Sequence, residues 1–380
     1  MTISNREGSI QSRRARAGAA LWVAAGVCSL LGTACSSDSS AGDGAGGAAG
    51  NGSQSATNTC GSAKPTLLFA SKSILSGLAL DDSSLYFVES LDVVSKLPKA
   101  GGTPTTVGEG RVSIWVPQLY FDAGSLYFTD NSDVFKLDVA TGARVSLATS
   151  KAKFENGIDS GLALDKDFVY FGDDVHGDSG EPLGTVNRVP KAGGAATPLA
   201  TAQAAPGSLA VDDARAYWVN NGTLTASFDS LNNGGIGSVA LTGGAAQALF
   251  SVQPDGKGIA PMLDLVLTAS DIYFTSANLD DLSSSGAYRL PKAGGAPVSF
   301  SDYSTLSGFI LNDALYVDNG DRIAKFDLAT GAKTDIVCFP NSGEGSIVMA
   351  HDATHIYYIK SEPPSGGNST PDSVYSIPLE

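Results

Sequence analysis

The chain contains seven copies of one short motif, and this repeat constrains the fold more than any other feature. Each copy centres on a tyrosine between apolar residues, and successive tyrosines lie 41, 43, 47, 56, 43 and 41 residues apart. The seven triplets are Leu85-Tyr86-Phe87, Leu126-Tyr127-Phe128, Val169-Tyr170-Phe171, Ala216-Tyr217-Trp218, Ile272-Tyr273-Phe274, Leu315-Tyr316-Val317 and Ile356-Tyr357-Tyr358. A period of about 40–50 residues is typical of the four-stranded blades of a β-propeller.

Each repeat divides into four β-rich runs, which we name strands A to D. In the first copy, strand A ends at Leu80, and B, C and D cover residues 85–88, 93–97 and 104–107. An Asp/Ser turn separates A from B, and a Pro-Lys-Ala-Gly-Gly turn at Pro98 separates C from D. We therefore predict an all-β chain with a single propeller of seven four-stranded blades over residues 65–380. A six- or eight-bladed ring would require a miscounted tyrosine.

The two ends of the repeat region predict how the ring closes. The last repeat supplies strands at residues 346–349, 356–359 and 374–377 and then ends without a strand D. A surplus strand at residues 65–70 precedes the first repeat and resembles the strand D at residues 196–200. We expect this N-terminal strand to complete the last blade, because that pairing leaves no large gap between the ends of the ring.

Two segments carry a resemblance to a known family. Leu209-Ala210-Val211-Asp212 before Tyr217, and Leu126-Tyr127-Phe128-Thr129-Asp130, resemble YWTD repeats and their NHL-type relatives. The resemblance covers most of residues 65–380 and implies a propeller that serves as a binding platform, although some hydrolases and lyases use similar propellers. YWTD propellers usually have six blades, so the predicted seven departs from that pattern.

Residues 1–34 have the features of a bacterial lipoprotein signal peptide. An apolar stretch at residues 17–31 follows four arginines and ends in Leu31-Gly32-Thr33-Ala34-Cys35, which resembles a lipobox. We therefore predict that Cys35 receives diacylglycerol and an acyl chain such as palmitate. The alternative is an ordinary signal peptide cut nearby. The four arginines are Arg6, Arg13, Arg14 and Arg16.

Residues 35–64 consist almost entirely of small and polar residues and cannot bury apolar surface, so we expect a flexible tether. No Asp follows Cys35, which favours an outer-membrane lipoprotein, on the periplasmic side or at the cell surface. Cys60 and Cys338 remain as one candidate disulfide in an oxidising compartment.

Charge excludes one class of partner. Loss of the leader removes four of the 24 basic residues and one of the 39 acidic residues. The mature chain then has 20 basic and 38 acidic residues, a net charge of −18. Such a body repels phosphate backbones, so we expect no nucleic-acid binding. We expect a monomer that meets the membrane only through its lipid anchor.

Blade topology sorts the connections onto two faces. The A–B and C–D turns share one face and are short and repetitive, as structural turns are. The B–C and D–A connections share the other face, which we name the rim face. Nearly all of the long, irregular segments fall there, and they are residues 172–185, 220–235, 276–286, 360–373, 150–160 and 251–261. Variable loops on one face are the expected location of a binding site.

One rim loop is rich in possible cation ligands. Residues 172–181 include Asp173, Asp174, Asp178 and Glu181, together with one histidine. Oxygen ligands of this kind suit Ca²⁺, although the spacing is not that of an EF-hand. A solvated acidic loop without a metal is the alternative. The Asp-rich A–B turns, in contrast, are predicted to cap their own backbone.

The starts of the inner strands supply the second candidate site. Most residues there are small, but Gln118 and Asp264 are not, and Asp159 and Glu344 lie close to the same position in their own repeats. A buried carboxylate at a channel mouth needs a cation or hydrogen-bond donors. Hydrogen bonds to the neighbouring backbone are the alternative to a ligand site.

No catalytic constellation is present in the sequence, and we name no catalytic residue. The expected function is that of an envelope-anchored binding or scaffold lipoprotein, which recognises a protein, a glycan or a cation through the rim face. The alternative is a metal-assisted hydrolase or lyase with its site at the channel mouth, centred on Asp264.

Overall fold

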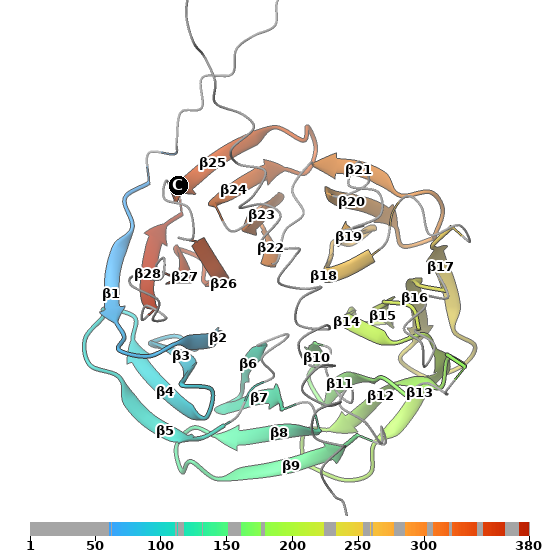
Figure 1. Cartoon of the computed structure of the whole chain (residues 1–380), viewed down its shortest axis with the longest axis horizontal. Helices are drawn as coiled ribbons and strands as arrows, with labels where there is room; N and C mark the ends of the chain where they lie inside the picture. The colour runs from blue at the N-terminus through green and yellow to red at the C-terminus, as the bar shows by residue number, and fades with distance from the viewer. Residues whose placement is uncertain are drawn as a thin grey trace, which may run out of the picture. The chain divides into compact units, whose positions relative to one another are not determined.

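The computed structural model describes residues 61 and 63–379 with gaps at 111, 113–117, 131, 151–160, 176–178, 224–232, 254–258, 260, 277–285, 302–306, 319–320, 340–344 and 362–371. The described residues form strands and turns and contain no helix. Seven antiparallel sheets of four strands each are arranged in a ring around a central axis (Figure 1). The predicted seven-bladed propeller is confirmed.

The A strands lie nearest the axis and the D strands at the outer edge (Figure 1). The A strands are β2 (Leu75–Leu80), β6 (Leu119–Asp122), β10 (Leu162–Leu164), β14 (Pro206–Val211), β18 (Pro261–Leu267), β22 (Ser307–Leu311) and β26 (Gly345–His351). The B strands are β3 (Ser84–Glu89), β7 (Ser125–Thr129), β11 (Phe168–Asp173), β15 (Arg215–Asn220), β19 (Asp271–Ser276), β23 (Ala314–Asp318) and β27 (His355–Ser361).

The C strands are β4 (Val93–Pro98), β8 (Asp133–Asp138), β12 (Gly184–Pro190), β16 (Gly235–Ala240), β20 (Gly286–Pro291), β24 (Arg322–Asp327) and β28 (Ser373–Pro378). The D strands are β5 (Thr105–Glu109), β9 (Arg144–Thr149), β13 (Thr197–Gln203), β17 (Gln247–Ser251), β21 (Val298–Ser301), β25 (Lys333–Cys338) and β1 (Thr66–Ala70).

The N-terminal strand closes the ring as predicted. The last sheet has the order β1-β28-β27-β26, so β1 supplies strand D of blade seven. It pairs antiparallel with β28, with Thr66 opposite Ser376 and Ala70 opposite Ser373 (Figure 1). The ring therefore joins residues that are about 300 positions apart in the chain.

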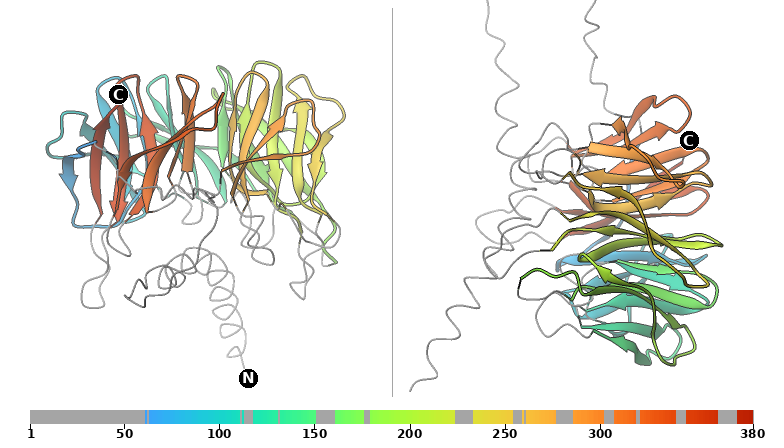
Figure 2. Two further views of the ribbon diagram at one scale, coloured as in Figure 1. Left: turned by 90° about the horizontal axis from the view of Figure 1, so that it is seen from above. Right: turned by 90° about the vertical axis from the view of Figure 1, so that its right-hand side faces the viewer.

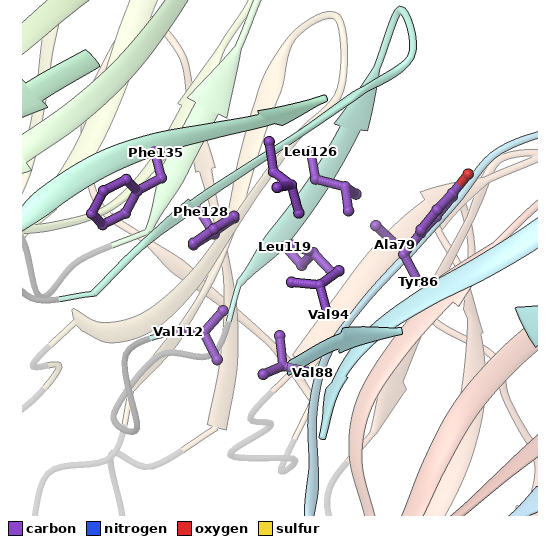
Figure 3. Close-up of a cluster of buried hydrophobic side chains, with 10 residues drawn as sticks. Ala79, Tyr86, Val88, Val94, Val112, Leu119, Leu126, Phe128 and Phe135 are labelled. Atoms are coloured by element: carbon purple, nitrogen blue, oxygen red, sulfur yellow. The ribbon is translucent and has the colours of Figure 1, made fainter. Parts of the chain in front are cut away.

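The core lies between neighbouring blades. Between blades one and two, Tyr86 and Val88 from β3 pack with Leu126 and Phe128 from β7, and all four side chains are fully buried (Figure 3). Similar clusters fill the spaces between the other blades. Alternate residues of a strand face opposite sides of its sheet, so each B strand packs on both neighbouring blades.

In four of the seven blades, a hydrogen bond to the A–B turn explains the repeated tyrosine. The hydroxyl of Tyr86 donates to Asp81 Oδ2 at 2.7 Å, and Asp81 Oδ1 accepts the backbone N–H groups of Ser83 and Ser84. The same arrangement occurs at Asp165 with Tyr170, Asp212 with Tyr217 and Asp352 with Tyr357. The turn interpretation of these acidic residues is thus confirmed.

A second repeated contact fixes the residue that follows strand C, which we name the clamp position. In all seven blades, its backbone N–H donates to a carbonyl of the A–B turn in the same blade. The side chain is lysine in blades one, three and five, and aliphatic in the others. The clamp positions are Lys99, Val139, Lys191, Leu241, Lys292, Leu328 and Leu379.

Each clamp lysine bonds to the preceding blade. Lys99 Nζ lies 2.8 Å from Asp352 Oδ2, Lys191 Nζ 2.6 Å from Asp122 Oδ2, and Lys292 Nζ 2.7 Å from Asp212 Oδ2. Each ammonium group also lies over the ring of the tyrosine in that blade, at 5.2 to 5.5 Å from its centroid. In blade seven, Leu379 packs in one cluster with Leu311 of blade six, so an aliphatic pair replaces the ion pair there.

The A–B and C–D turns therefore form one face, the clamp face, which holds neighbouring blades together. Figure 2 shows the ring edge-on, with short described turns joining the strands along one side. The aliphatic clamp residues Val139, Leu241 and Leu328 also pack against the interblade clusters.

We predict that Lys292→Met destabilises the fold by about 1 kcal/mol at neutral pH, a figure reduced for solvent screening of the half-exposed carboxylate. Burial acts to raise the pKa of Asp212, but hydrogen bonds from Lys292, the turn backbone and Tyr217 outweigh it and lower the pKa from 3.8 to about 2. The stabilisation is present above the unfolded pKa and is lost as pH falls through about 2.

Urea unfolding at several pH values measures this effect. The difference between wild type and Lys292→Met should be largest near neutral pH and shrink as pH falls through about 2. Asp213→Asn, a change at the exposed neighbour, serves as the control and should leave stability unchanged. A difference that persists undiminished at low pH would contradict the ion-pair assignment.

Candidate functional site

The rim face carries the loops that differ between blades, and two of these loops lock together at their base. In blade three, Leu183 N–H donates to Val175 O at 3.0 Å and closes the neck of the B–C loop. Thr223 of blade four, which is 1% exposed, donates from its hydroxyl to Gly180 O at 2.6 Å. Thr223 N–H in turn donates to Asn233 Oδ1. The blade-three loop therefore stands on a fixed base.

The predicted acidic ligands of that loop have different environments. Asp173 is buried at the end of β11 and accepts a hydrogen bond from the Ser150 hydroxyl at 2.6 Å. Asp174 is half-buried and Glu181 is exposed. Asp178 lies outside the described residues. Among the described residues, no three His, Cys, Asp or Glu side chains gather as a metal site. Calcium binding by this loop stays a prediction.

Gln118 contacts the next blade. Its Oε1 accepts hydrogen bonds from the Tyr120 hydroxyl at 2.8 Å and from Leu162 N–H at 3.1 Å. The side chain packs so closely on Gly161 that a Cβ atom there would lie 2.2 Å from Oε1. Gln118 thus links the inner strands of blades two and three.

The other channel-mouth residues are less fully described. The pairing of β18 with β19 shifts between Leu263 and Leu265, so Asp264 sits at an irregularity in the inner strand. Such bulges redirect side chains and occur next to functional sites. Asp159 and Glu344 lie outside the described residues. Whether these three acidic residues meet stays a prediction.

One polar network on the rim face was not predicted from the sequence. Trp218 Nε1–H donates to Gln203 Oε1 at 3.0 Å and to Asn220 Oδ1 at 3.1 Å, and Asn220 Nδ2 donates to the same Gln203 oxygen. Trp218 itself is fully buried. The sequence signals of this network are two side-chain amides at strand ends, Gln203 at the end of β13 and Asn220 at the end of β15.

Exposed apolar side chains accompany these polar groups on the rim face. Ile74, in the connection from β1 to β2, is 47% exposed, and Leu183, at the neck of the blade-three loop, is 53% exposed. Ile74 is held in place because its carbonyl accepts Ser90 N–H from the B–C turn of blade one. The described rim face therefore offers amide, acidic and apolar groups on fixed backbone.

Two of the three cysteines named above lie outside the described residues. These are Cys35 and Cys60. Cys338 is the last residue of β25 and is half-buried.

Comparisons with known proteins support the fold alone. No protein-family model matches the chain, and no curated protein matches its sequence. An oligogalacturonate lyase from Vibrio parahaemolyticus is similar in structure, with TM-score 0.59 and 10% identity over 85% of this chain and 95% of that one. The AfRom2 CNH domain has TM-score 0.55 and 12% identity over 83% and 100%. An oligogalacturonate lyase in complex with manganese has TM-score 0.55 and 12% identity over 78% and 86%.

Proposed function

We propose that this chain is an envelope-anchored binding protein that recognises a protein, a glycan or a cation through its rim face. The observation that carries the proposal is the commitment of the opposite face to structure. All seven clamp positions hold the A–B turns, and three clamp lysines are paired with acids of the preceding blade. The irregular loops of the rim face have no repeated sequence of this kind, so their side chains are available for recognition.

The rim surface has a composition suited to recognition. Fixed loop bases limit the entropy lost on binding, because the backbone at Gly180 and Thr223 is already ordered by hydrogen bonds. Ile74 and Leu183 add apolar area, and Glu181 adds negative charge. The net charge of −15 for the whole chain favours cationic over anionic partners.

Affinity capture tests this proposal. The purified chain is immobilised and exposed to envelope extract. Each retained species is then titrated against the chain in solution to test for saturable binding. The same purified protein is analysed for bound metal. The proposal predicts that at least one retained species binds the chain saturably. Metal at one equivalent per chain that disappears in Asp264→Asn would favour the enzymatic alternative instead, a metal-assisted hydrolase or lyase at the channel mouth.

We further propose that a lipid on Cys35 anchors the protein to the outer membrane through the tether at residues 35–64. The leader and its lipobox-like end support this proposal. In the part of the chain that the structure describes, no helix has the length and apolarity of a membrane span.

We predict that Cys35→Ser moves the protein from the membrane fraction to the soluble fraction, because the substituted residue cannot accept the lipid. Fractionation followed by mass spectrometry of the mature N-terminus measures both the location and the acyl chain. Cys28→Ser, a change within the leader, is the matched control and should leave the protein in the membrane fraction. A wild-type N-terminus without an acyl chain would contradict the prediction.

A further inference from the structure

A buried carboxyl group lies where the closing strand leaves blade seven. Asp372, directly before β28, is 3% exposed. Its Oδ2 accepts Leu75 N–H at 2.7 Å, and its Oδ1 accepts the Ser361 hydroxyl at 3.0 Å. Its backbone bonds to the same connection, since Ser71 N–H donates to Asp372 O and Asp372 N–H donates to Ser73 O. One residue thus holds both ends of the β1–β2 connection.

No cation neutralises this carboxyl group among the described residues. The charged residues on the elements packed around it are Lys72 on the connection, Lys360 at the end of β27, and Glu89 and Asp92 at the B–C turn of blade one. None of these forms an ion pair with Asp372 in the described part of the chain. Burial raises the pKa of Asp372, and the hydrogen bonds from Leu75 and Ser361 only partly offset that rise.

We propose that Asp372 is a proton-operated latch on ring closure, which holds the β1–β2 connection tightly when protonated and loosens it when ionised. A protonated carboxyl keeps both contacts, because Oδ2 still accepts Leu75 N–H while the Oδ1 proton is donated to the Ser361 hydroxyl. Ionisation places a negative charge in a buried site where no cation of the described residues offsets it, and this favours opening of the connection to water. This inference stands apart from the rim-face function.

The sign of the pH dependence follows from the two ionisation equilibria. The pKa of Asp372 is higher in the closed ring than in the opened connection, so the closed form binds the proton more tightly. The extra stability of the closed form is complete below the ordinary pKa of the opened state. It is lost as pH rises through the higher pKa of the closed state.

Hydrogen exchange at Leu75 measures the latch directly, because its N–H donates to the carboxyl group. The full chain is followed from about pH 4 to about pH 8, and exchange rates are corrected for intrinsic chemistry. The opening equilibrium constant should rise with pH by up to about tenfold per unit and then level off. A constant that is flat or falls with pH would overturn the proposal.

Three variants separate the latch from general packing. Asp372→Asn can keep both hydrogen bonds without a charge, so its opening constant should be low and independent of pH. Ser361→Ala removes one hydrogen-bond donor to the ionised carboxyl and so raises its pKa further. The rise in the opening constant should therefore extend to higher pH. Asp327→Asn, at an exposed turn cap of blade six, should retain the wild-type profile. A wild-type slope in Asp372→Asn, or an unchanged profile in Ser361→Ala, would also overturn the proposal.

Discussion

Replacement of Cys60 or Cys338 by serine is expected to lower the melting temperature while leaving the ring folded at room temperature. A bridge between these residues would enclose nearly the whole propeller. It would lower the conformational entropy of the unfolded chain and so stabilise the fold by up to about 5 kcal/mol. The bond would also pin β1, whose detachment opens the ring. Strain and residual structure in the unfolded chain reduce this figure, so it is an upper value.

The described residues support the proximity that this prediction needs. Gly61 packs so closely on β25 that a Cβ atom there would lie 2.1 Å from the carbonyl oxygen of Ile336, two residues before Cys338. Ala63 also packs in the cluster that contains Val337. Non-reducing peptide mapping and thermal unfolding with and without reductant test the bond. Free thiols on both residues of exported protein, or melting unaffected by reductant, would contradict it.

Exchange of the blade-three loop is expected to weaken partner binding without unfolding the ring. Val175 O and Leu183 N–H already form a closed pair, so residues 176–182 can be replaced by Asn-Gly, which favours a tight two-residue turn. The exchange removes Glu181 and the Gly180 contact to Thr223 but leaves Asp173 and its bond to Ser150 in place. We expect at least a tenfold loss of affinity, about 1.4 kcal/mol.

A matched change on the clamp face provides the control for this exchange. Replacement of Lys99-Ala100 in the C–D turn of blade one by Leu-Thr copies the corresponding turn of blade four. This variant should lose some stability, because the bond to Asp352 is lost, but it should bind the partner as wild type does. Unchanged binding in the loop exchange, together with weakened binding in the turn variant, would reverse the assignment of the two faces.

The fold could be predicted from the sequence because its signals are local and repeated. Turn residues bracket every strand, so the predicted B strand at residues 85–88 appears as β3, Ser84–Glu89. The closing strand was also predictable, since residues 65–70 resemble a strand D without a blade of its own. Because the motif is repeated seven times, a wrong strand assignment in one copy can be recognised by comparison with the other six.

The contacts between blades could not be predicted, because they depend on how neighbouring sheets are aligned in space. The sequence shows Lys99 in a turn, but its bond to Asp352 joins residues 253 positions apart. Gln118 stood out as a channel-mouth residue, but the sequence did not show that its Oε1 accepts a hydrogen bond from Leu162 N–H of the next blade. Conversely, Asp372 carried no signal, because only the folded ring buries it beside Leu75.

Hydrogen exchange across the whole chain, with and without the captured partner, tests most directly which face binds. If the rim face is the binding surface, protection should appear at the Val175–Leu183 neck, at Ile74 and around Thr223. The clamp-face turns, such as the one from Pro98 to Gly102, should exchange as in the free protein. Protection confined to those turns, with none at the rim loops, would contradict the account.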